Sequence, residues 1–375
     1  CFSHLRWDFV YQRPQHLMSR FAKHHRVFFL EESVYHEGKD MLKIRRTDSN
    51  IVIAIPMLNK KIIATRASLL EREKKLMNFL ISRNKITNFI SWYYTPMALK
   101  FSDHLIPLAT VYDCMDELSA FKFAPQELKI REAELFNKAD VVFTGGNALF
   151  KAKKNYHANI HAFPSSIDKS HFEKARRLCE EPQDQAAIPG PRFGFQGVLD
   201  ERFNIGLIAE VAKQKPDWHF VFVGPVVKID PAELPKGANI HYLGAKKYEE
   251  LPAYLSGWDM AIIPFEKNDS TKFISPTKTP EYLAAGKPVI SSSITDVVHP
   301  YGEKNLVHIA DDATSFIACA TKELSKSTSQ VTEWLLKVDD YLKPLSWDNS
   351  FHNMKEKVDA CVAAKRKKET DLKSV

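Results

Sequence analysis

The 375-residue sequence contains no run of about 20 uncharged apolar residues, so no segment of it is predicted to cross a membrane as a helix. No secretory signal peptide is recognisable either. The chain opens at Cys1 on apolar sequence and has no initiator Met, and we interpret it as a fragment that has lost its first strand or a preceding domain. The missing signal therefore does not decide between an exported and an intracellular protein.

Cysteine is scarce, scattered and odd in number, with five residues in all. This distribution fits neither a disulfide framework nor a zinc site. It favours a reducing, cytoplasmic compartment, and we extend that prediction to the inner face of a membrane. The five are Cys1, Cys114, Cys179, Cys319 and Cys361.

The charge pattern excludes one class of partner and favours another. Nucleic-acid motifs are lacking, so nucleic acid is not predicted to bind. The net charge of +7 suits a phosphate-bearing ligand or an anionic membrane surface. Residues 59–88 are predicted to form a strongly basic helix, whose charged side is either simply solvated or a peripheral contact with a membrane or an anionic acceptor.

Short apolar runs alternate with amphipathic stretches along the whole chain. This alternation predicts an α/β protein with parallel sheets covered on both faces. A polar, Pro-rich stretch at 180–191 divides the runs into two series, so we predict two Rossmann-like, doubly wound domains facing a cleft. The predicted strands are residues 26–30, 51–55, 110–112, 141–143, 193–195, 219–223, 240–243, 260–264 and 288–291, with helices at 205–214 and 248–255.

The predicted domains are residues 1–180 and 191–345, followed by a C-terminal helix and basic tail at 346–375. Residues 347–364 have helical apolar spacing, and the basic run 365–368 closes the helix. Positive charge at that end complements the helix dipole.

Residues 272–290, KFISPTKTPEYLAAGKPVI, contain the most informative motif of the chain. A short helix is predicted at 280–285, with Glu281 in its first turn, where the dipole favours a carboxylate that can also accept ribose hydroxyls. The preceding loop, 275–278, offers backbone N–H groups and the ammonium of Lys278, a combination typical of an anion site. The same pattern also fits an ordinary capped helix.

This segment resembles the donor-binding segment of retaining GT-B glycosyltransferases of family 4, in which a glutamate of this helix binds the donor ribose ahead of an AxGxPV turn. Four further segments resemble one bacterial subgroup, whose members are sometimes fused to UDP-galactopyranose mutase. They are CFSHLRWDFVYQRPQHL, VYDCMDELSAF, HAFPSSID and FVGPVVKIDPAELP.

The resemblance implies a GT-B fold, with the C-terminal helix crossing back to the first domain. It also implies a hexosyltransferase of polysaccharide or cell-envelope biosynthesis that uses no cofactor. The donor would be a nucleotide-diphosphate sugar, a UDP-sugar being favoured, and the acceptor a glycan or a lipid-linked glycan. In this family retention is assigned to a front-face route, so no nucleophile is predicted.

The resemblance places the donor in the second domain. Glu281 would bind the ribose, and Lys278 would neutralise the departing diphosphate. The sequence departs from the family where Phe273 replaces an earlier glutamate about two helical turns upstream. It departs again after the first strand of this domain, where only Arg202 remains as a phosphate-binding cation. The other predicted donor contacts are Lys272, Ser275 and Thr277 at the phosphates, and Gly244 and Lys246 at the base.

The first domain is expected to bind the acceptor. Asp113 and Asp116 follow a strand at its carboxyl end, and we predict that they order the acceptor hydroxyl or accept its proton. Asp116 is also suited to cap the next helix. Arg6, Trp7 and Arg13 offer a stacking surface and two cations for the acceptor, although Trp7 is equally suited to cover the end of the sheet.

Three alternatives remain open from the sequence. A sugar-nucleotide epimerase of the same fold would use the donor site without an acceptor, and a two-lobed binding protein would also pair two α/β domains. A non-catalytic partner of a fused enzyme would explain the missing glutamate. No Asp-x-Asp pair or His/Asp cluster is placed to hold Mg²⁺ against phosphate, so no metal is predicted.

Overall fold

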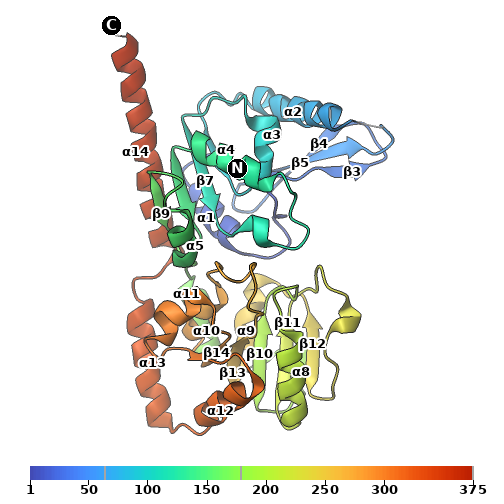
Figure 1. The fold of residues 1–375 in the computed structure, drawn as a ribbon, viewed down its shortest axis with the longest axis vertical. Coiled ribbons are helices and arrows are strands. Elements are labelled where there is room, and N and C mark those ends of the chain that lie inside the picture. Colours follow the sequence, from blue (N-terminus) through green and yellow to red (C-terminus); the bar gives the residue numbers. More distant parts are fainter. Residues whose placement is uncertain (63–64, 178–179, 374–375) are drawn as a thin grey trace.

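The computed structural model describes residues 1–62, 65–177 and 180–373, and Cys179 lies outside this range. Figure 1 shows two α/β lobes, one above the other, with a long helix, α14 (Trp347–Lys373), running alongside the upper lobe. Each lobe is built on its own sheet, so the predicted α/β class with two Rossmann-like domains is confirmed.

The first domain contains a sheet of nine strands within the described residues, in the order β3-β5-β2-β1-β6-β7-β8-β9, with β4 antiparallel to β5. All other neighbours are parallel. The strands are β1 (Phe2–Ser3), β2 (Phe28–Glu31), β3 (Val34–His36), β4 (Met41–Arg46), β5 (Val52–Asn59), β6 (Ile90–Tyr93), β7 (Ala109–Cys114), β8 (Val141–Thr144) and β9 (Ile160–Ala162). The α-helices are α1 (Arg13–Phe21), α2 (Arg66–Arg83), α3 (Leu99–Ser102), α4 (Leu128–Lys138) and α5 (Asn147–Lys153).

The second domain has an all-parallel sheet in the order β12-β11-β10-β13-β14-β15. Its strands are β10 (Arg192–Gln196), β11 (His219–Val223), β12 (Ile240–Gly244), β13 (Met260–Ile263), β14 (Val289–Ser291) and β15 (His308–Ile309). Its α-helices are α8 (Ile205–Gln214), α9 (Leu251–Ser256), α10 (Lys278–Ala284), α11 (Thr295–Val297), α12 (Ala313–Leu324) and α13 (Thr328–Leu342). Strand order reverses between β10 and β13, so their carboxyl ends form the crevice where this fold binds ligands.

The predicted strands and helices reappear because continuous apolar runs favour strands buried on both faces. The helix predicted at 205–214 and the strand predicted at 219–223 have the predicted bounds. In α8, Asn204 caps the first turn by accepting a hydrogen bond from the backbone N–H of Leu207 at 2.8 Å.

The C-terminal helix returns to the first domain, as predicted. Trp347, Phe351 and Met354 are buried in the same apolar cluster as Leu17 of α1. Arg20 of α1 adds a two-pronged ion pair to Asp348, with N–O distances of 2.8 and 3.1 Å. The chain therefore joins the two lobes twice, between the end of β9 and Ile167, which is buried in the core of the second domain, and again before α14 (Figure 1).

Two predicted boundaries were wrong. The basic helix expected over 59–88 spans only Arg66–Arg83, because the chain up to Asn59 pairs in β5 and Thr65 caps the helix. The supposed linker at 180–191 contains α7 (Gln183–Ala186), which packs on the second domain. Its Gln185 is fully buried and bonds to the carbonyl of Tyr254 and the indole N–H of Trp258, each at 2.9 Å. Within the described residues no helix is long and apolar enough to cross a bilayer.

Candidate active site between the two domains

A cavity of about 780 Å³ lies between the two domains, at the carboxyl ends of β10 and β11. Its first-domain wall includes the segment Trp7–Arg13 together with Asp116 and Gly145. Its second-domain wall comes from the turns after β10 and β11 and from the start of α10. Both walls are loops at the carboxyl edges of parallel sheets, which is where ligands bind in this architecture.

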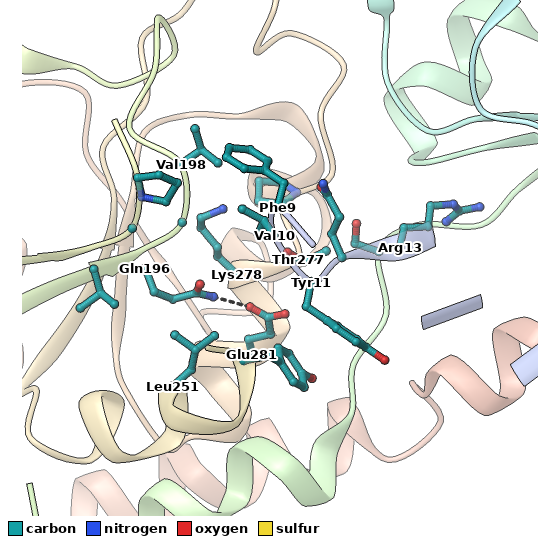
Figure 2. A pocket seen from close by; sticks show the side chains of 18 of the residues that line it. Phe9, Val10, Tyr11, Arg13, Gln196, Val198, Leu251, Thr277, Lys278 and Glu281 are labelled. Carbon is teal, nitrogen blue, oxygen red and sulfur yellow. Dashed lines mark hydrogen bonds between the residues drawn. The ribbon is translucent and has the colours of Figure 1, made fainter. Parts of the chain in front are cut away.

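Glu281 lies at one end of this cavity, in the first turn of α10, and is only 5% exposed. One carboxylate oxygen accepts a hydrogen bond from the side-chain amide of Gln196 at 2.6 Å (Figure 2). Gln196 is the last residue of β10, and its backbone N–H donates to the hydroxyl of Tyr282 at 2.8 Å. These bonds fix the carboxylate in position. Burial raises the pKa of Glu281, and the charge of the nearby Lys278 opposes this shift.

Lys278 begins α10 and reaches into the cavity beside the turn that follows β10 (Figure 2). Gly197 in that turn has a φ of +132°, and a Cβ there would overlap the end of the Lys278 side chain. The backbone conformation therefore favours glycine, and a side chain there would also displace the end of Lys278. Burial, and then the charge of Arg202, lower the pKa of Lys278. An anionic ligand would remove this penalty by supplying the missing negative charge.

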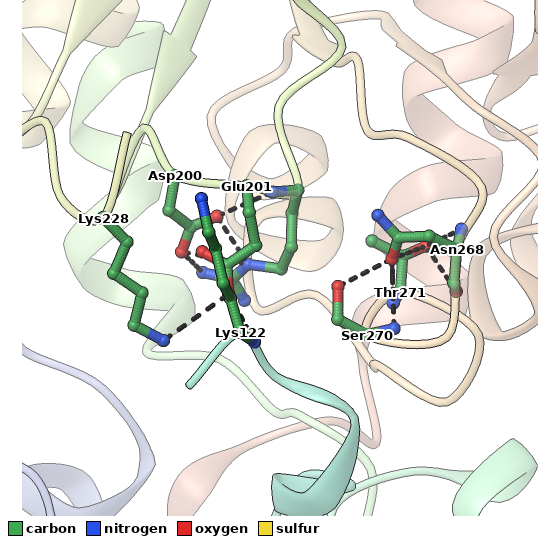
Figure 3. Close-up of polar contacts among 8 residues, drawn as sticks. Lys122, Asp200, Glu201, Lys228, Asn268, Ser270 and Thr271 are labelled. Atoms are coloured by element: carbon green, nitrogen blue, oxygen red, sulfur yellow. Dashed lines mark hydrogen bonds and ion pairs between the residues drawn. The ribbon is translucent and has the colours of Figure 1, made fainter. Parts of the chain in front are cut away.

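Arg202 also lines the cavity, but its guanidinium is already paired with Asp200, with N–O distances of 2.7 to 3.2 Å. Figure 3 labels Asp200 and the nearby Glu201 and Lys228. Phe121 of the first domain lies 5.5 Å from this guanidinium and 5.2 Å from Lys228 Nζ. Lys228 in turn pairs with Glu201 at 3.5 Å. Arg202 therefore contributes less free positive charge than an unpaired arginine would.

Tyr248 and Lys246 line the cavity from the segment that follows β12. Lys246 pairs with Asp184 at 2.6 Å. The Tyr248 hydroxyl is buried and has no hydrogen-bond partner in the described part of the chain. Burial raises its pKa, and the charge of Glu281 raises it further. Tyr11 of the first domain stacks on Tyr248 with ring centroids 4.5 Å apart, so this part of the cavity has an aromatic wall from each domain.

The two predicted acceptor-side carboxylates occupy different environments. Asp116 lines the cavity, and burial raises its pKa to about 6, opposed by the charges of Arg202 and Arg13. Asp113 lies behind the wall, fully buried, and its oxygens are 3.0 and 3.2 Å from Nε of Arg13. Arg13 also donates to the carbonyl of Phe163 at 2.7 Å. Asp113 thus acts on the cavity only by holding Arg13.

Nine of the predicted site residues meet around one cavity, and four do not. Lys272 is exposed and lies over the ring of Phe273, because the loop turns its side chain away from the cavity. Gly244 is exposed outside the wall, and Arg6 is held by Glu31 at 3.0 Å, so neither residue lines the cavity as predicted. Asp113 is the fourth residue that does not line it. The nine are Trp7, Arg13, Asp116, Arg202, Lys246, Ser275, Thr277, Lys278 and Glu281.

Sequence reasoning did not identify Gln196, Tyr248 or Asp200. Gln196 could have been found as the polar residue that ends an otherwise apolar strand. The positions of Tyr248 and Asp200 depend on loop packing, for which the sequence carries no local signal. Within the described residues no group of three or more His, Cys, Asp or Glu side chains could hold a metal ion, and metal-independent turnover stays a prediction.

The second domain matches a known protein family. Residues 191–326 match the family described as "Glycosyl transferases group 1". A protein named for teichuronic acid biosynthesis, the glycosyltransferase TuaH of Bacillus subtilis (strain 168), is 26% identical over 236 residues, covering 58% of this chain and 59% of TuaH. The chain thus spans less than two thirds of that relative.

Solved structures share the architecture over nearly the whole chain. Trehalose 6-phosphate synthase from Burkholderia multivorans has a TM-score of 0.67 at 12% identity, over 97% of this chain and 98% of that one. Sucrose-phosphate synthase from Thermosynechococcus elongatus has a TM-score of 0.62 at 12% identity, over 96% and 92%. The predicted fold is thereby confirmed: the chain has the GT-B fold, and its second domain matches the glycosyl transferases group 1 family.

Proposed function

We propose that this protein transfers a sugar from a nucleotide-diphosphate sugar, with UDP as the favoured nucleotide, to a glycan or lipid-linked acceptor. The observation that carries the proposal is the pairing, in one interdomain cavity, of a buried carboxylate at Glu281 with a half-buried ammonium at Lys278, one helical turn apart. A carboxylate suits ribose hydroxyls, and an ammonium beside a helix start suits a diphosphate. The two groups lie on the family-matched domain.

In this arrangement Glu281 orients the nucleoside, since Gln196 already fixes one of its oxygens and leaves the remaining lone pairs for the ribose. Lys278 faces the diphosphate and neutralises the charge that grows as the sugar leaves. Arg202 adds a smaller contribution because it shares its charge with Asp200. The Tyr248 hydroxyl is available to the ribose or the base.

Asp116 faces the same space from the first domain and would order the acceptor hydroxyl or accept its proton. A carboxylate whose pKa is raised to about 6 is well matched to proton transfer near neutral pH. Contact between the domains would exclude water and so limit hydrolysis of the donor.

The neighbouring structures support the choice of donor and stereochemistry. One, named for trehalose-6-phosphate from E. coli, is described as bound with UDP-2-fluoro glucose, with a TM-score of 0.65 at 12% identity. Another concerns glycosyl transfer with retention by trehalose-6-phosphate synthase. We extend both features to this chain, and TuaH directs the acceptor prediction towards cell-envelope polysaccharide.

A thermal-shift screen with UDP, GDP, ADP and dTDP tests the donor site. A ligand at 100 times its Kd stabilises the native state by about 2.7 kcal/mol, a readily measured rise in melting temperature. We expect UDP to give the largest rise, and product mass spectrometry with UDP-sugars then identifies the transfer. If none of the four nucleotides raises the melting temperature, the proposed function is wrong.

Peripheral membrane contact through residues 59–88 is proposed as a secondary property. In Figure 1, α2 with β3, β4 and β5 lies on the side of the first domain away from α14. Phe79 is 52% exposed on α2, but Arg72 is engaged by Asp40 at 2.6 Å, so only part of the charge is free. Flotation with vesicles containing anionic lipid should carry the protein upward, and equal flotation with neutral vesicles would contradict the electrostatic contact.

A further inference from the structure

The N-terminus of α5, in the first domain, is capped by a carboxylate of the second domain. The two oxygens of Asp296 accept hydrogen bonds from the backbone N–H groups of Asn147 and Ala148, each at 2.8 Å. The helix's own N-cap residue is Gly146, which has no side chain to do this. Asp296 is only 6% exposed, so the contact is a buried link between the domains.

Gly146 is required at this link by space rather than by backbone conformation. Its φ of −165° is open to any residue. A Cβ there would overlap the Asp296 carboxylate and would lie 2.9 Å from Cβ of Ser275. Gly146 therefore lets the first domain touch both Asp296 and the loop that carries Ser275.

That loop, residues 273–277, leads directly into Lys278 and is held at two more points, one on the connection that follows β9 and one on the first domain. The Ser165 hydroxyl donates to the carbonyl oxygen of Ser275 at 2.5 Å, and the Ser165 N–H donates to the Ser275 hydroxyl at 3.3 Å. Phe273 packs against the apolar cluster of the first domain. The residue that replaces the family's glutamate thus serves as an interdomain contact.

We propose that Asp296 and Gly146 are positioning residues for sugar transfer. By joining the domains, they hold the donor loop 273–277 on the first domain, so that Lys278 and Glu281 reach their binding positions only when the domains are in contact. The expected effect on turnover rests on the proposed function, whereas the expected effect on the position of the loop 273–277 does not. A donor site that is complete only in the closed state couples nucleotide binding to domain contact.

The test compares Asp296→Ala and Gly146→Ala with Asp312→Ala as a matched control. Asp312 also caps a helix, α12, by accepting a hydrogen bond from the Ser315 N–H at 2.8 Å, but it does so within the second domain. We expect both interface variants to raise the KM for the UDP-sugar and the Kd for UDP by about tenfold or more, because Asp296→Ala removes both hydrogen bonds to the carboxylate and the added methyl group of Gly146→Ala displaces it. The control should lower the melting temperature and leave both constants within about twofold of wild type.

Hydrogen–deuterium exchange of the nucleotide-free protein gives an independent readout. The peptide covering 273–278 should exchange faster in Asp296→Ala and Gly146→Ala than in the wild type. Its exchange rate should be unchanged in the control. Asp296→Asn, which keeps the volume and one accepting oxygen, should be intermediate and provides the comparison if the alanine variant does not fold. Unchanged exchange and unchanged KM in the interface variants would overturn the inference. Wild-type protein that binds no nucleotide would refute the proposed function, while the exchange comparison would still decide this inference.

Discussion

Replacing Glu281 by Gln separates ribose recognition from phosphate recognition within one helix turn. The carboxylate is buried and already accepts one hydrogen bond from Gln196 at 2.6 Å. Glutamine has one accepting oxygen, so it cannot keep that bond and also accept from two ribose hydroxyls. A hydrogen bond to a charged group contributes about 1.5–3 kcal/mol and a neutral one about 0.5–1.5 kcal/mol. The expected loss is therefore about tenfold in affinity. It should be similar for UMP and UDP, because both carry the ribose.

Lys278→Ala should behave differently, because its ammonium faces the diphosphate. The substitution is expected to weaken UDP binding by about tenfold or more and UMP binding much less. The loss of UDP affinity should become smaller as the salt concentration rises. The substitution should also lower kcat, since charge on the leaving diphosphate grows towards the transition state. Lys272→Ala is the matched control, because that lysine belongs to the same loop but is exposed outside the cavity.

Calorimetric titration of the three variants with UMP and UDP, at low and high salt, gives the comparison. If Glu281→Gln and Lys278→Ala lower the affinity for UMP and UDP equally, the ribose and phosphate ends of the site have been misplaced. If Lys272→Ala matches Lys278→Ala, the effect is one of general surface charge, and the specific role of Lys278 is refuted.

Three further results are expected. Asp116→Asn should lower the rate of sugar transfer by about a hundredfold with little change in UDP affinity, and a wild-type rate in this variant would contradict the role of Asp116. Asp113→Asn should mainly lower the melting temperature, because breaking a buried ion pair costs about 3–5 kcal/mol. Turnover should continue in EDTA, and loss of activity that Mg²⁺ or Mn²⁺ restores would show that a metal is needed. On the alkaline side, UDP affinity should fall as pH rises through the lowered pKa of Lys278, since the charged form of the lysine binds phosphate. Lys278→Arg, which stays charged, should remove this alkaline fall, and persistence of the fall in that variant would exclude Lys278 as its cause.

Much of the donor half of the site could be predicted because it is local in sequence. Glu281 and Lys278 are three residues apart on one helix, and a helix start is recognisable from its Pro and its acidic first turn. The strands of both sheets could likewise be placed, since an apolar run such as 219–223 specifies burial on both faces whatever its neighbours are.

The acceptor half could be predicted only in part. Asp113 and Asp116 look alike in sequence, both at the carboxyl end of β7, yet one is buried against Arg13 and the other lines the cavity. Asp113 lies within β7, whereas Asp116 lies in the loop two residues beyond its end, and which of the two faces the cavity depends on how that loop and the second domain are placed.

The sequence by itself determined the two α/β domains, the order of their elements and the carboxylate–ammonium pair of the donor helix, because these depend on residue periodicity and on short-range spacing. Only the tertiary structure decided which charges are free. Arg13 is paired with Asp113 from 100 residues away, and Asp296 caps a helix from 149 residues away, whereas Lys272 faces outward. Such partners meet through packing between elements distant in the chain, and desolvation and pairing, not residue type, then set the charge that a ligand encounters.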